Sequence, residues 1–372
     1  MTMRPPRTRL VGSELAAELA EVGYESLTPD NAARLRRLAR KGAFVEPSEP
    51  TYVVYRLASD GHQQTGVVVE VEIEAYRDGR IRAHEATEPE RVSRLESVLE
   101  ATRLELVPLT LAHRPDAGLR SALVTASAGD PDVRVATERV DQAAWIVRDA
   151  ELVRAIDKAL PGISPLYIAD GHHRIAAADQ FAARHHRSGT VAASDFILGA
   201  LFPWDEVRIL GYHRGIRRPE GRAAADLVAA IAGQPAVVSV EATGLEAPTP
   251  GPGAPTMCLD GQWYRIQLRP AVSDSPRDAL DLAIFDVAVL GSALEITDPT
   301  ADSRVQPVPG TVDAAGLAER CAERDEIGFL FHPPTPDQVR AVSDAGQVMP
   351  RKATWFDPKA RTGPFLRDLD DR

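Results

Sequence analysis

The sequence predicts a protein of the mixed α/β class, either α/β or α+β, because strand-like and helix-like segments alternate through its middle. Residues 66–76 alternate apolar with acidic side chains, which is typical of a strand with one buried and one solvated face. Residues 166–169 are rich in β-formers, and an alanine-rich helical run follows almost at once. Residues 195–202 are almost wholly apolar and predict a buried strand.

The length and composition are those of a globular protein with two or three compact parts. The chain has 372 residues, of which 44% are hydrophobic and 26% are charged. We predict an N-terminal helical segment over residues 1–50 and a core over 51–242. A Pro/Gly-rich linker or loop over 243–256 follows, and then an α/β region over 257–372.

Charge and cysteine content exclude several classes of protein. The net charge is -11, so the overall field repels nucleic acid and no nucleic-acid partner is expected. The two cysteines form no CxxC pair, which argues against a zinc site and fits a reducing compartment. No apolar run approaches the roughly 20 residues of a membrane span. No signal peptide is recognisable either, and we expect a cytoplasmic protein with no membrane partner.

The strongest motif is Asp170-Gly171-His172-His173-Arg174, between the strand at 166–169 and the helix after it. The first N–H groups of a helix lack internal partners and its dipole favours anions, so the motif predicts an anion site. The guanidinium of Arg174 suits phosphate oxygens, and Asp170 could hold a metal ion. In the alternative interpretation, Asp170 only caps the helix and the histidines lie on the surface.

A second motif is His84-Glu85-Ala86-Thr87, which follows a turn and precedes a predicted helix. A carboxylate beside histidine in a loop suits a general base, and Glu85 is that carboxylate. The alternative is that Thr87 and Glu90 form a capping box at the start of the helix.

Two further segments could contribute to a site. Tyr212-His213-Arg214 follows an apolar strand, and Met349–Lys359 combines cations, a hydroxyl and aromatic side chains. Lys352 and Thr354 could reach a phosphate or a nucleotide. The chain lacks the P-loop, the GxGxxG fingerprint and the GxSxG elbow.

Together the four motifs resemble the family called domain of unknown function 1015. Its members carry an HERT-like box, a YIADGHHR box, a THR box and an MPxKSTYFxPK box in this order, and the resemblance covers roughly residues 50–365. This chain departs from the pattern at Ala86, where arginine is usual, at Ala353, where serine is usual, and at Trp355, where tyrosine is usual. Because of these departures, the family pattern does not determine the identity of the substrate.

The HE and DGHHR boxes also resemble those of free serine kinases related to the ParB and sulfiredoxin domains. This resemblance implies a ParB/sulfiredoxin-like nucleotide-binding core with an additional mixed α/β C-terminal region. It further implies that Glu85 is the catalytic base on a substrate hydroxyl and that Asp170 is catalytic. Gly171, Arg174 and Ala177 would belong to an element that binds nucleotide phosphates.

We therefore predict a small-molecule kinase that transfers a phosphoryl group from ATP or ADP, with Mg²⁺, to free serine or a related amino acid. The predicted roles are catalytic for Glu85, Asp170 and His172; nucleotide-binding for Gly171, His172, His173, Arg174, Lys352 and Thr354; substrate-binding for His84, Thr87, His213 and Arg214; and metal-binding for Asp170. The alternatives are a non-catalytic ParB-like nucleotide-binding regulator and a ParB-like nuclease. A homodimer is among the expected assemblies.

Overall fold

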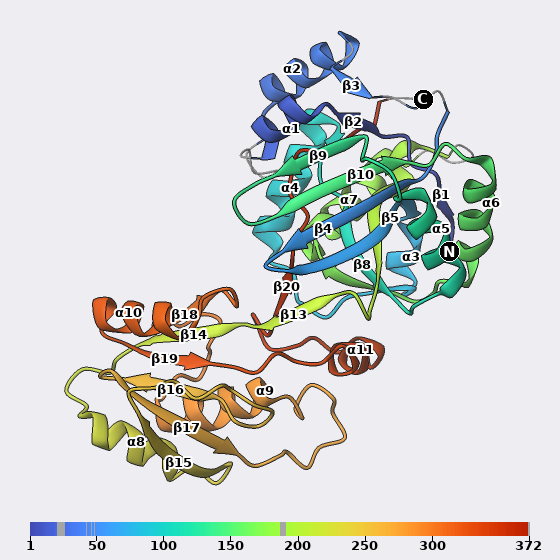
Figure 1. Ribbon diagram of the computed structural model, residues 1–372. Coiled ribbons are helices and arrows are strands. Elements are labelled where there is room, and N and C mark those ends of the chain that lie inside the picture. The colour runs from blue at the N-terminus through green and yellow to red at the C-terminus, as the bar shows by residue number, and fades with distance from the viewer. Residues whose placement is uncertain (21–26, 42, 46, 48, 187–190, 371–372) are drawn as a thin grey trace. The chain divides into compact units, whose positions relative to one another are not determined.

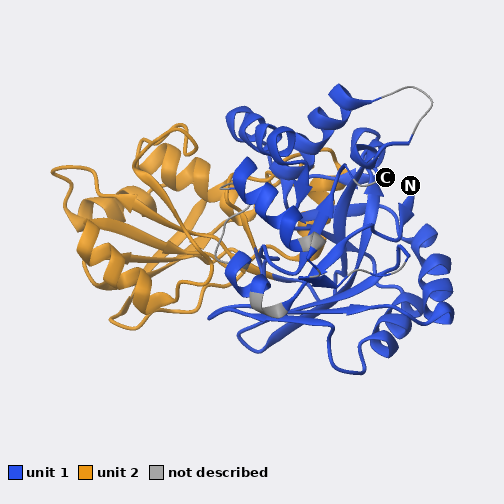
Figure 2. Cartoon of the chain, turned by 90° about the horizontal axis from the view of Figure 1, so that it is seen from above, with its two compact units in different colours: residues 1–208, 356–372 blue, residues 209–355 orange. Residues whose placement is uncertain are grey.

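The computed structural model describes residues 1–20, 27–41, 43–45, 47, 49–186 and 191–370 (Figure 1). The chain divides into two compact units, drawn in two colours in Figure 2 and described here separately. Unit 1 comprises Met1–Arg208 and Phe356–Arg372, and unit 2 comprises Ile209–Trp355. The mixed α/β class is confirmed, because both units contain helices and sheets. The domain limits expected from the sequence, at residues 50, 242 and 256, differ from the limits of these two units and stay a prediction. Part of the expected segment 1–50 lies outside the described residues.

A nine-stranded sheet forms the centre of the described part of unit 1, in the order β6-β11-β8-β12-β5-β4-β10-β9, with β1 paired to β5. The strands are β1 (Met3–Arg4), β4 (Val53–Ser59), β5 (His62–Glu72), β6 (Ile81–Arg82), β8 (Leu109–His113), β9 (Val133–Ala136), β10 (Asp141–Ile146), β11 (Leu166–Asp170) and β12 (Phe196–Pro203). Two neighbouring pairs, β6 with β11 and β8 with β12, are parallel. β11 runs antiparallel to β8.

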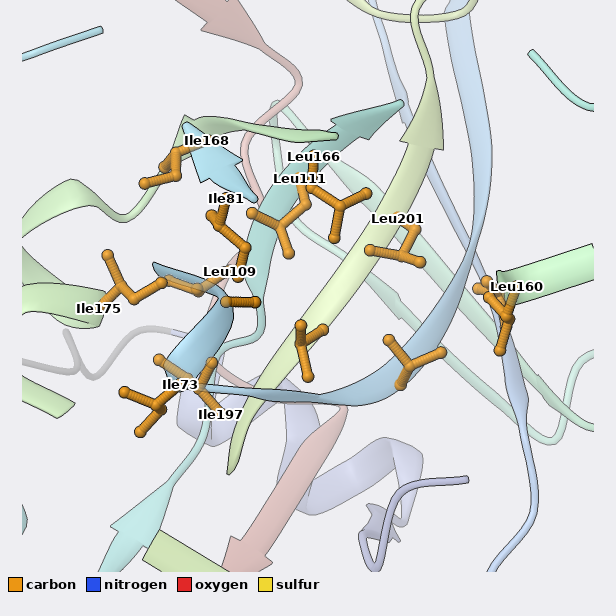
Figure 3. Close-up of a cluster of buried hydrophobic side chains, with 14 of the residues drawn as sticks. Ile73, Ile81, Leu109, Leu111, Leu160, Leu166, Ile168, Ile175, Ile197 and Leu201 are labelled. Carbon is orange, nitrogen blue, oxygen red and sulfur yellow. The ribbon is translucent and has the colours of Figure 1, made fainter. Parts of the chain in front are cut away.

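Helices cover one face of this sheet over a large apolar core (Figure 3). They are α4 (Pro89–Thr102), α5 (Ala117–Ala126), α6 (Ala150–Ala159) and α7 (His172–His185). Leu109 and Leu111 from β8, Ile168 from β11 and Ile175 from α7 meet in this core, so the strand end and the helix start are held firmly together. The short helices α3 (Glu74–Arg77), η2 (Leu160–Gly162) and η3 (Ala193–Asp195) lie in connections.

The opposite face carries a second core and a small sheet in the order β3-β2-β21-β7. Its strands are β2 (Arg9–Val11), β3 (Phe44–Val45), β7 (Leu104–Glu105) and β21 (Phe365–Asp368), and the helices α1 (Ser13–Ala20) and α2 (Pro29–Arg40) contribute to the same core.

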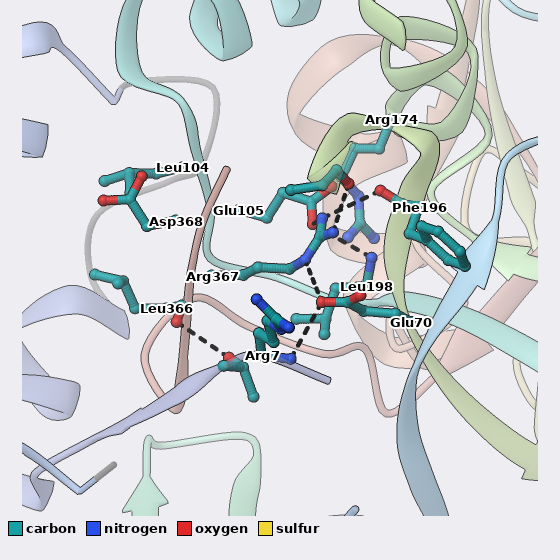
Figure 4. Close-up of polar contacts among 12 residues, drawn as sticks. Arg7, Glu70, Leu104, Glu105, Arg174, Phe196, Leu198, Leu366, Arg367 and Asp368 are labelled. Atoms are coloured by element: carbon teal, nitrogen blue, oxygen red, sulfur yellow. Dashed lines mark hydrogen bonds and ion pairs between the residues drawn. The ribbon is translucent and has the colours of Figure 1, made fainter. Parts of the chain in front are cut away.

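The expectation of a strand over residues 66–76 with a solvated acidic face is corrected in part: β5 ends at Glu72, Glu74 is exposed at the start of α3, and Glu70 is buried. Glu70 on β5 is only 1% exposed, and the side chain of Arg367 from β21 lies against it. Arg367 donates from Nε to Glu70 Oε1 at 2.9 Å and from Nη1 to Glu105 Oε2 at 2.6 Å (Figure 4). Arg4 donates to Glu70 Oε2 at 2.7 Å. Burial of a carboxylate is tolerable here because cations and hydrogen bonds satisfy it.

Unit 2 contains a six-stranded sheet in the order β15-β17-β16-β19-β14-β18. Its strands are β14 (His213–Arg217), β15 (Val237–Gly244), β16 (Thr256–Leu259), β17 (Gln262–Leu268), β18 (Val305–Val308) and β19 (Glu326–Leu330). Its helices are α8 (Ala224–Ala232), α9 (Asp281–Phe285), the π-helix η4 (Asp286–Ala293), α10 (Ala314–Arg324) and α11 (Pro336–Asp344). The Pro/Gly-rich segment 243–256 connects β15 to β16 within this unit.

The chain leaves unit 1 within β13 (Arg208–Gly211) and returns to it within β20 (Thr354–Asp357). Consequently the residues from Phe356 onward belong to the same unit as the motifs at 84–87 and 170–174. None of the described helices has the length and apolar character needed to cross a membrane.

Candidate active site

Two sequence motifs of unit 1 meet because the strands before them are parallel neighbours. Ile81 lies beside Leu166 and Arg82 beside Tyr167 in the β6–β11 pair. The segments that follow two parallel strands leave the sheet at the same edge. The His84-Glu85 segment therefore reaches the turn at the start of α7, where Glu85 Oε2 lies 3.5 Å from His172 Nδ1.

Gly171 shapes this turn. It is the residue before α7 and has a φ of 108°, a conformation that L side chains rarely adopt. A Cβ atom there would lie 2.5 Å from Leu109 Cδ2 and 2.9 Å from Arg174 Nη2. The chain can therefore turn from β11 directly into α7 only with glycine at this position. The alternative in which Asp170 caps the helix is wrong, because Gly171 occupies the N-cap position and no side chain caps it.

Asp170 is held between two cations. Lys359 Nζ donates to its Oδ1 at 3.0 Å, and Arg174 Nη2 donates to its Oδ2 at 2.9 Å. Burial alone would raise the pKa of the Asp170 carboxyl, but the charges of Lys359 and Arg174 outweigh burial and hold that pKa well below its usual range. Asp170 is therefore a carboxylate at neutral pH.

Lys359 is the site residue that sequence reasoning missed. It ends the fourth motif, Met349–Lys359, in which the sequence analysis predicts Lys352 as the cation that contacts phosphate. Lys359 could not be distinguished from Lys352 by composition, because only the return of the chain to unit 1 brings its ammonium to Asp170.

Arg174 is engaged with protein atoms. Its Nη1 donates to the carbonyl oxygens of Val107 and Pro108, both at 2.8 Å, in addition to the contact with Asp170. Arg174 thus fixes the carboxylate relative to the segment that leads into β8. Its contact with a phosphate stays a prediction.

The histidines of the two motifs form a buried pair behind Glu85. The rings of His84 and His172 pack edge to face with centroids 4.5 Å apart. The backbone N–H of His84 donates to His172 Nε2 at 3.4 Å, so the Nδ1 of His172 carries the proton and faces Glu85. Burial lowers the pKa of both histidines to about 3. Both are therefore neutral at neutral pH.

The helix after Glu85 does not begin with a capping box. Glu88 is the N-cap residue of α4, Pro89 follows it, and no side chain makes a cap hydrogen bond. The alternative role for Thr87 and Glu90 is therefore wrong. His173 on α7 contacts the start of α4, since its Nε2 accepts a hydrogen bond from the Glu88 N–H at 3.0 Å.

The third motif and the first part of the fourth meet in unit 2. Arg214 is 3% exposed and donates to the carbonyl oxygens of Arg351 at 2.6 Å and Lys352 at 3.1 Å. Lys352 has a φ of 56°, and its Nζ lies 5.5 Å from the ring centroid of Tyr212. Arg214 thus fixes the backbone at Arg351 and Lys352 through these two hydrogen bonds. Contacts of His213, Arg214, Lys352 and Thr354 with nucleotide or substrate stay predictions.

The donor atoms around Asp170 do not suffice for a magnesium ion. Mg²⁺ takes a near-octahedral set of oxygen ligands. Both oxygens of Asp170 accept from protein cations. In the described ranges, no three His, Cys, Asp or Glu side chains are grouped to hold a metal ion. These residues do not form a magnesium site by themselves, and the role of Asp170 as a metal ligand stays a prediction.

The fold and site together define a mixed α/β protein with a carboxylate, a cation pair and a helix N-terminus at one sheet edge. The family model described as "Protein of unknown function (DUF1015)" matches residues 18–287. The chain belongs to this family, and the resemblance to it is confirmed. No curated protein matches it.

Solved structures with a similar chain fold are distant. C-terminally truncated SbnI from Staphylococcus aureus has a TM-score of 0.41 and 13% identity, over 80% of this chain and 87% of that one. A mutant free serine kinase in complex with AMP has a TM-score of 0.40 and 12% identity, over 80% and 92%. A conserved hypothetical protein from Pyrococcus furiosus has a TM-score of 0.38 and 12% identity, over 82% and 96%.

Proposed function

We propose that this protein is a phosphotransferase that moves a phosphoryl group from ATP or ADP to the hydroxyl of free serine or a related amino acid, on a ParB/sulfiredoxin-like core. The observation that carries the proposal is the placement of Glu85. Its side chain is 31% exposed and lies against a buried histidine, beside the turn that leads from Asp170 into α7. A base next to an anion-binding helix start is what phosphoryl transfer to a hydroxyl needs.

Glu85 is the proposed general base. The substrate hydroxyl oxygen attacks the terminal phosphorus of the nucleotide and its proton passes to Glu85. The new O–P bond forms as the bond between that phosphorus and the nucleotide's bridging oxygen breaks, which leaves ADP from ATP or AMP from ADP. The Nδ1–H of neutral His172 faces Glu85 Oε2 at 3.5 Å and is the proposed positioning group for this carboxylate.

The turn at 170–174 is the proposed phosphate site. Gly171 carries no side chain, so phosphate oxygens can approach the first N–H groups of α7 closely. Asp170 and Lys359 form an ion pair at this turn. Of the two cations that contact Asp170, Lys359 has the more flexible side chain and the more compact charge. We propose that Lys359 moves from Asp170 to a phosphate oxygen when nucleotide binds. This would free one oxygen of Asp170 for Mg²⁺.

The test is incubation of the full chain with ATP or ADP, Mg²⁺ and a panel of hydroxyl amino acids, with mass spectrometry of the products. The proposal expects a phosphoamino acid from the wild type and none from Glu85→Gln. Glu90→Gln is the matched control, because Glu90 is an exposed glutamate in the first turn of α4. It should leave the rate unchanged.

Other outcomes would replace the proposal. Nucleotide binding in calorimetry without any phosphorylated product would favour the alternative of a non-catalytic nucleotide-binding regulator. Salt-dependent DNA binding with cleavage of the DNA would favour the alternative of a ParB-like nuclease. Equal product from wild type and Glu85→Gln would overturn the assignment of Glu85 as base.

A further inference from the structure

A second cavity of unit 1 lies where α4 and α7 end. Its volume is about 750 Å³, within the range of roughly 300–1,000 Å³ that is typical of small-molecule sites. Its lining includes Phe181 and His185 from the last turns of α7 and Arg103, the residue after α4. Because α7 has 14 residues, its two ends lie about 20 Å apart. The cavity is therefore separate from the candidate active site, which lies at the start of both helices.

Ser194 carries a hydroxyl that the described part of the chain does not use. The residue is 8% exposed, lines the cavity and lies in the short helix η3. Its hydroxyl forms no hydrogen bond to any described residue. Its oxygen does not belong to the unpartnered polar atoms that the protein seals from solvent, so it is open to the cavity. Polar side chains this deeply buried usually have a partner, and Ser194 therefore indicates a ligand.

Arg367 connects the backbone at Ser194 to a second part of the lining. Its Nη2 donates to the carbonyl oxygen of Ala193 at 2.6 Å, and its Nε donates to Glu70 Oε1 at 2.9 Å. The same Glu70 oxygen accepts from the backbone N–H of Arg7 at 3.1 Å (Figure 4). These hydrogen bonds fix the Ser194 turn and the Arg7 backbone on one wall of the cavity.

Arg7 supplies a positive charge that no described carboxylate balances. Its side chain is exposed, and its guanidinium forms no ion pair or hydrogen bond within the described ranges. Arg103 adds a second guanidinium, whose Cζ lies 4.8 Å from the ring centroid of Phe181. The partner of Arg103 is Glu100 at 3.3 Å, and Glu100 also contacts His185 at 2.7 Å. The charge of Arg7 is thus available to an anionic ligand, and that of Arg103 is partly balanced.

The carboxylates in the lining are already paired with other cations. Glu70 contacts two guanidiniums at 2.7 and 2.9 Å. Asp368 and Asp370 both contact Arg36, at 2.7 and 3.4 Å respectively. The lining therefore favours an anionic ligand over a cationic one.

We propose that this cavity binds a small phosphate monoester. One phosphate oxygen would accept from the Ser194 hydroxyl, and the other two would pair with the guanidinium of Arg7, whose planar fork matches phosphate geometry. A carboxylate has only two oxygens and satisfies these groups less completely. The remaining volume, lined by Phe181 and Leu369, accommodates the esterified body. This proposal does not depend on the phosphotransferase, because its nucleotide phosphates are assigned to the other end of α7.

The test is calorimetric titration of the full chain with ribose 5-phosphate, ribose and inorganic phosphate. Ribose 5-phosphate should bind and ribose should not. Inorganic phosphate should bind more weakly than the ester, because it leaves the rest of the cavity unfilled. Arg7→Gln and Ser194→Ala should each weaken ribose 5-phosphate about tenfold, since each removes a hydrogen bond to a charged group. Arg139→Gln is the matched control, because Arg139 is also exposed and without a described ion pair. It should bind like the wild type.

A further variant separates this cavity from the candidate active site. Lys359→Met should leave the affinity for ribose 5-phosphate unchanged. Intact binding of ribose 5-phosphate without any phosphoamino acid product would count against the phosphotransferase and not against this site. The proposal is overturned if ribose 5-phosphate gives neither heat nor a shift of its phosphorus resonance, or if inorganic phosphate binds equally well. It is also overturned if Lys359→Met weakens the ester, or if Arg7→Gln and Arg139→Gln bind it equally.

Discussion

Lys359 and Asp170 form an ion pair across 189 positions of sequence, with Nζ 3.0 Å from Oδ1. Because the pair joins the fourth sequence motif to the second, the candidate site depends on a part of the chain that follows all of unit 2. The consequences of this pair can be measured directly.

Lys359→Met should raise the pKa of Asp170 toward its ordinary value, since one of the two charges that lower it is lost. A depressed carboxyl pKa contributes stability above the unfolded-state pKa that is lost as the pH falls through the folded-state pKa. At neutral pH the variant should therefore lose about 1 kcal/mol of unfolding free energy, with partial exposure of the pair taken into account. Carbon NMR of the Asp170 carboxyl and urea unfolding check both effects. Lys158→Met on the exposed face of α6 is the control; an unchanged Asp170 titration would contradict the prediction.

Gly171→Ala should destabilise the protein by about 2 kcal/mol or more, because it combines a disfavoured positive φ with a contact to Leu109. Gly79→Ala provides the comparison, since Gly79 also has a positive φ but nothing lies within 4 Å of its Cβ position. That control should cost only about 1 kcal/mol. Urea unfolding distinguishes the two variants, and equal losses would show that packing at residue 171 contributes nothing.

The stability of the wild type should fall as the pH is lowered from about 6.5 toward 3. His84 and His172 have folded-state pKa values of about 3 against an ordinary 6.5, so between these values the unfolded chain binds protons that the folded chain excludes. His172→Phe removes one of these groups and should make the fall shallower. Unfolding free energies measured across this range test the prediction, and identical slopes would refute it.

Arg367→Met should cost roughly 3–5 kcal/mol, because it leaves the buried Glu105 without its cation and Glu70 with Arg4 alone. The triple variant that adds Glu70→Gln and Glu105→Gln should recover part of the loss, since neutral amides are cheaper to bury than carboxylates. Chemical denaturation measures both variants. If the triple variant is no more stable than the single one, packing rather than charge accounts for the loss.

The sequence predicted the local elements around the site well, because their signals are local. Apolar β-formers before Asp170 and alanines after Arg174 predict β11 and α7 without knowledge of the rest of the fold. The prediction that Glu85 lies near the turn at 170–174 depended on the resemblance to free serine kinases. The structure supplies its physical reason in the parallel β6–β11 pair, which two residues of β6 could not reveal in advance.

The parts that sequence reasoning missed are those decided by distant segments. The acidic pattern around Glu70 indicates a solvated face until Arg367 is known to lie over it. Lys359 and Lys352 are equivalent by composition, and only the path of the chain assigns one to Asp170 and the other to the loop held by Arg214. Long-range pairing of charges leaves no periodic signal in a sequence.

The return of the chain to unit 1 also has a consequence for biosynthesis. A ribosome produces Asp170 long before Lys359, and β21 with Arg367 comes later still. During translation the carboxylates of Asp170 and Glu70 must therefore exist without these cations, and nascent chains released before residue 359 would carry neither ion pair. Synthesis of residues 359–367 is thus itself the step that supplies both cations.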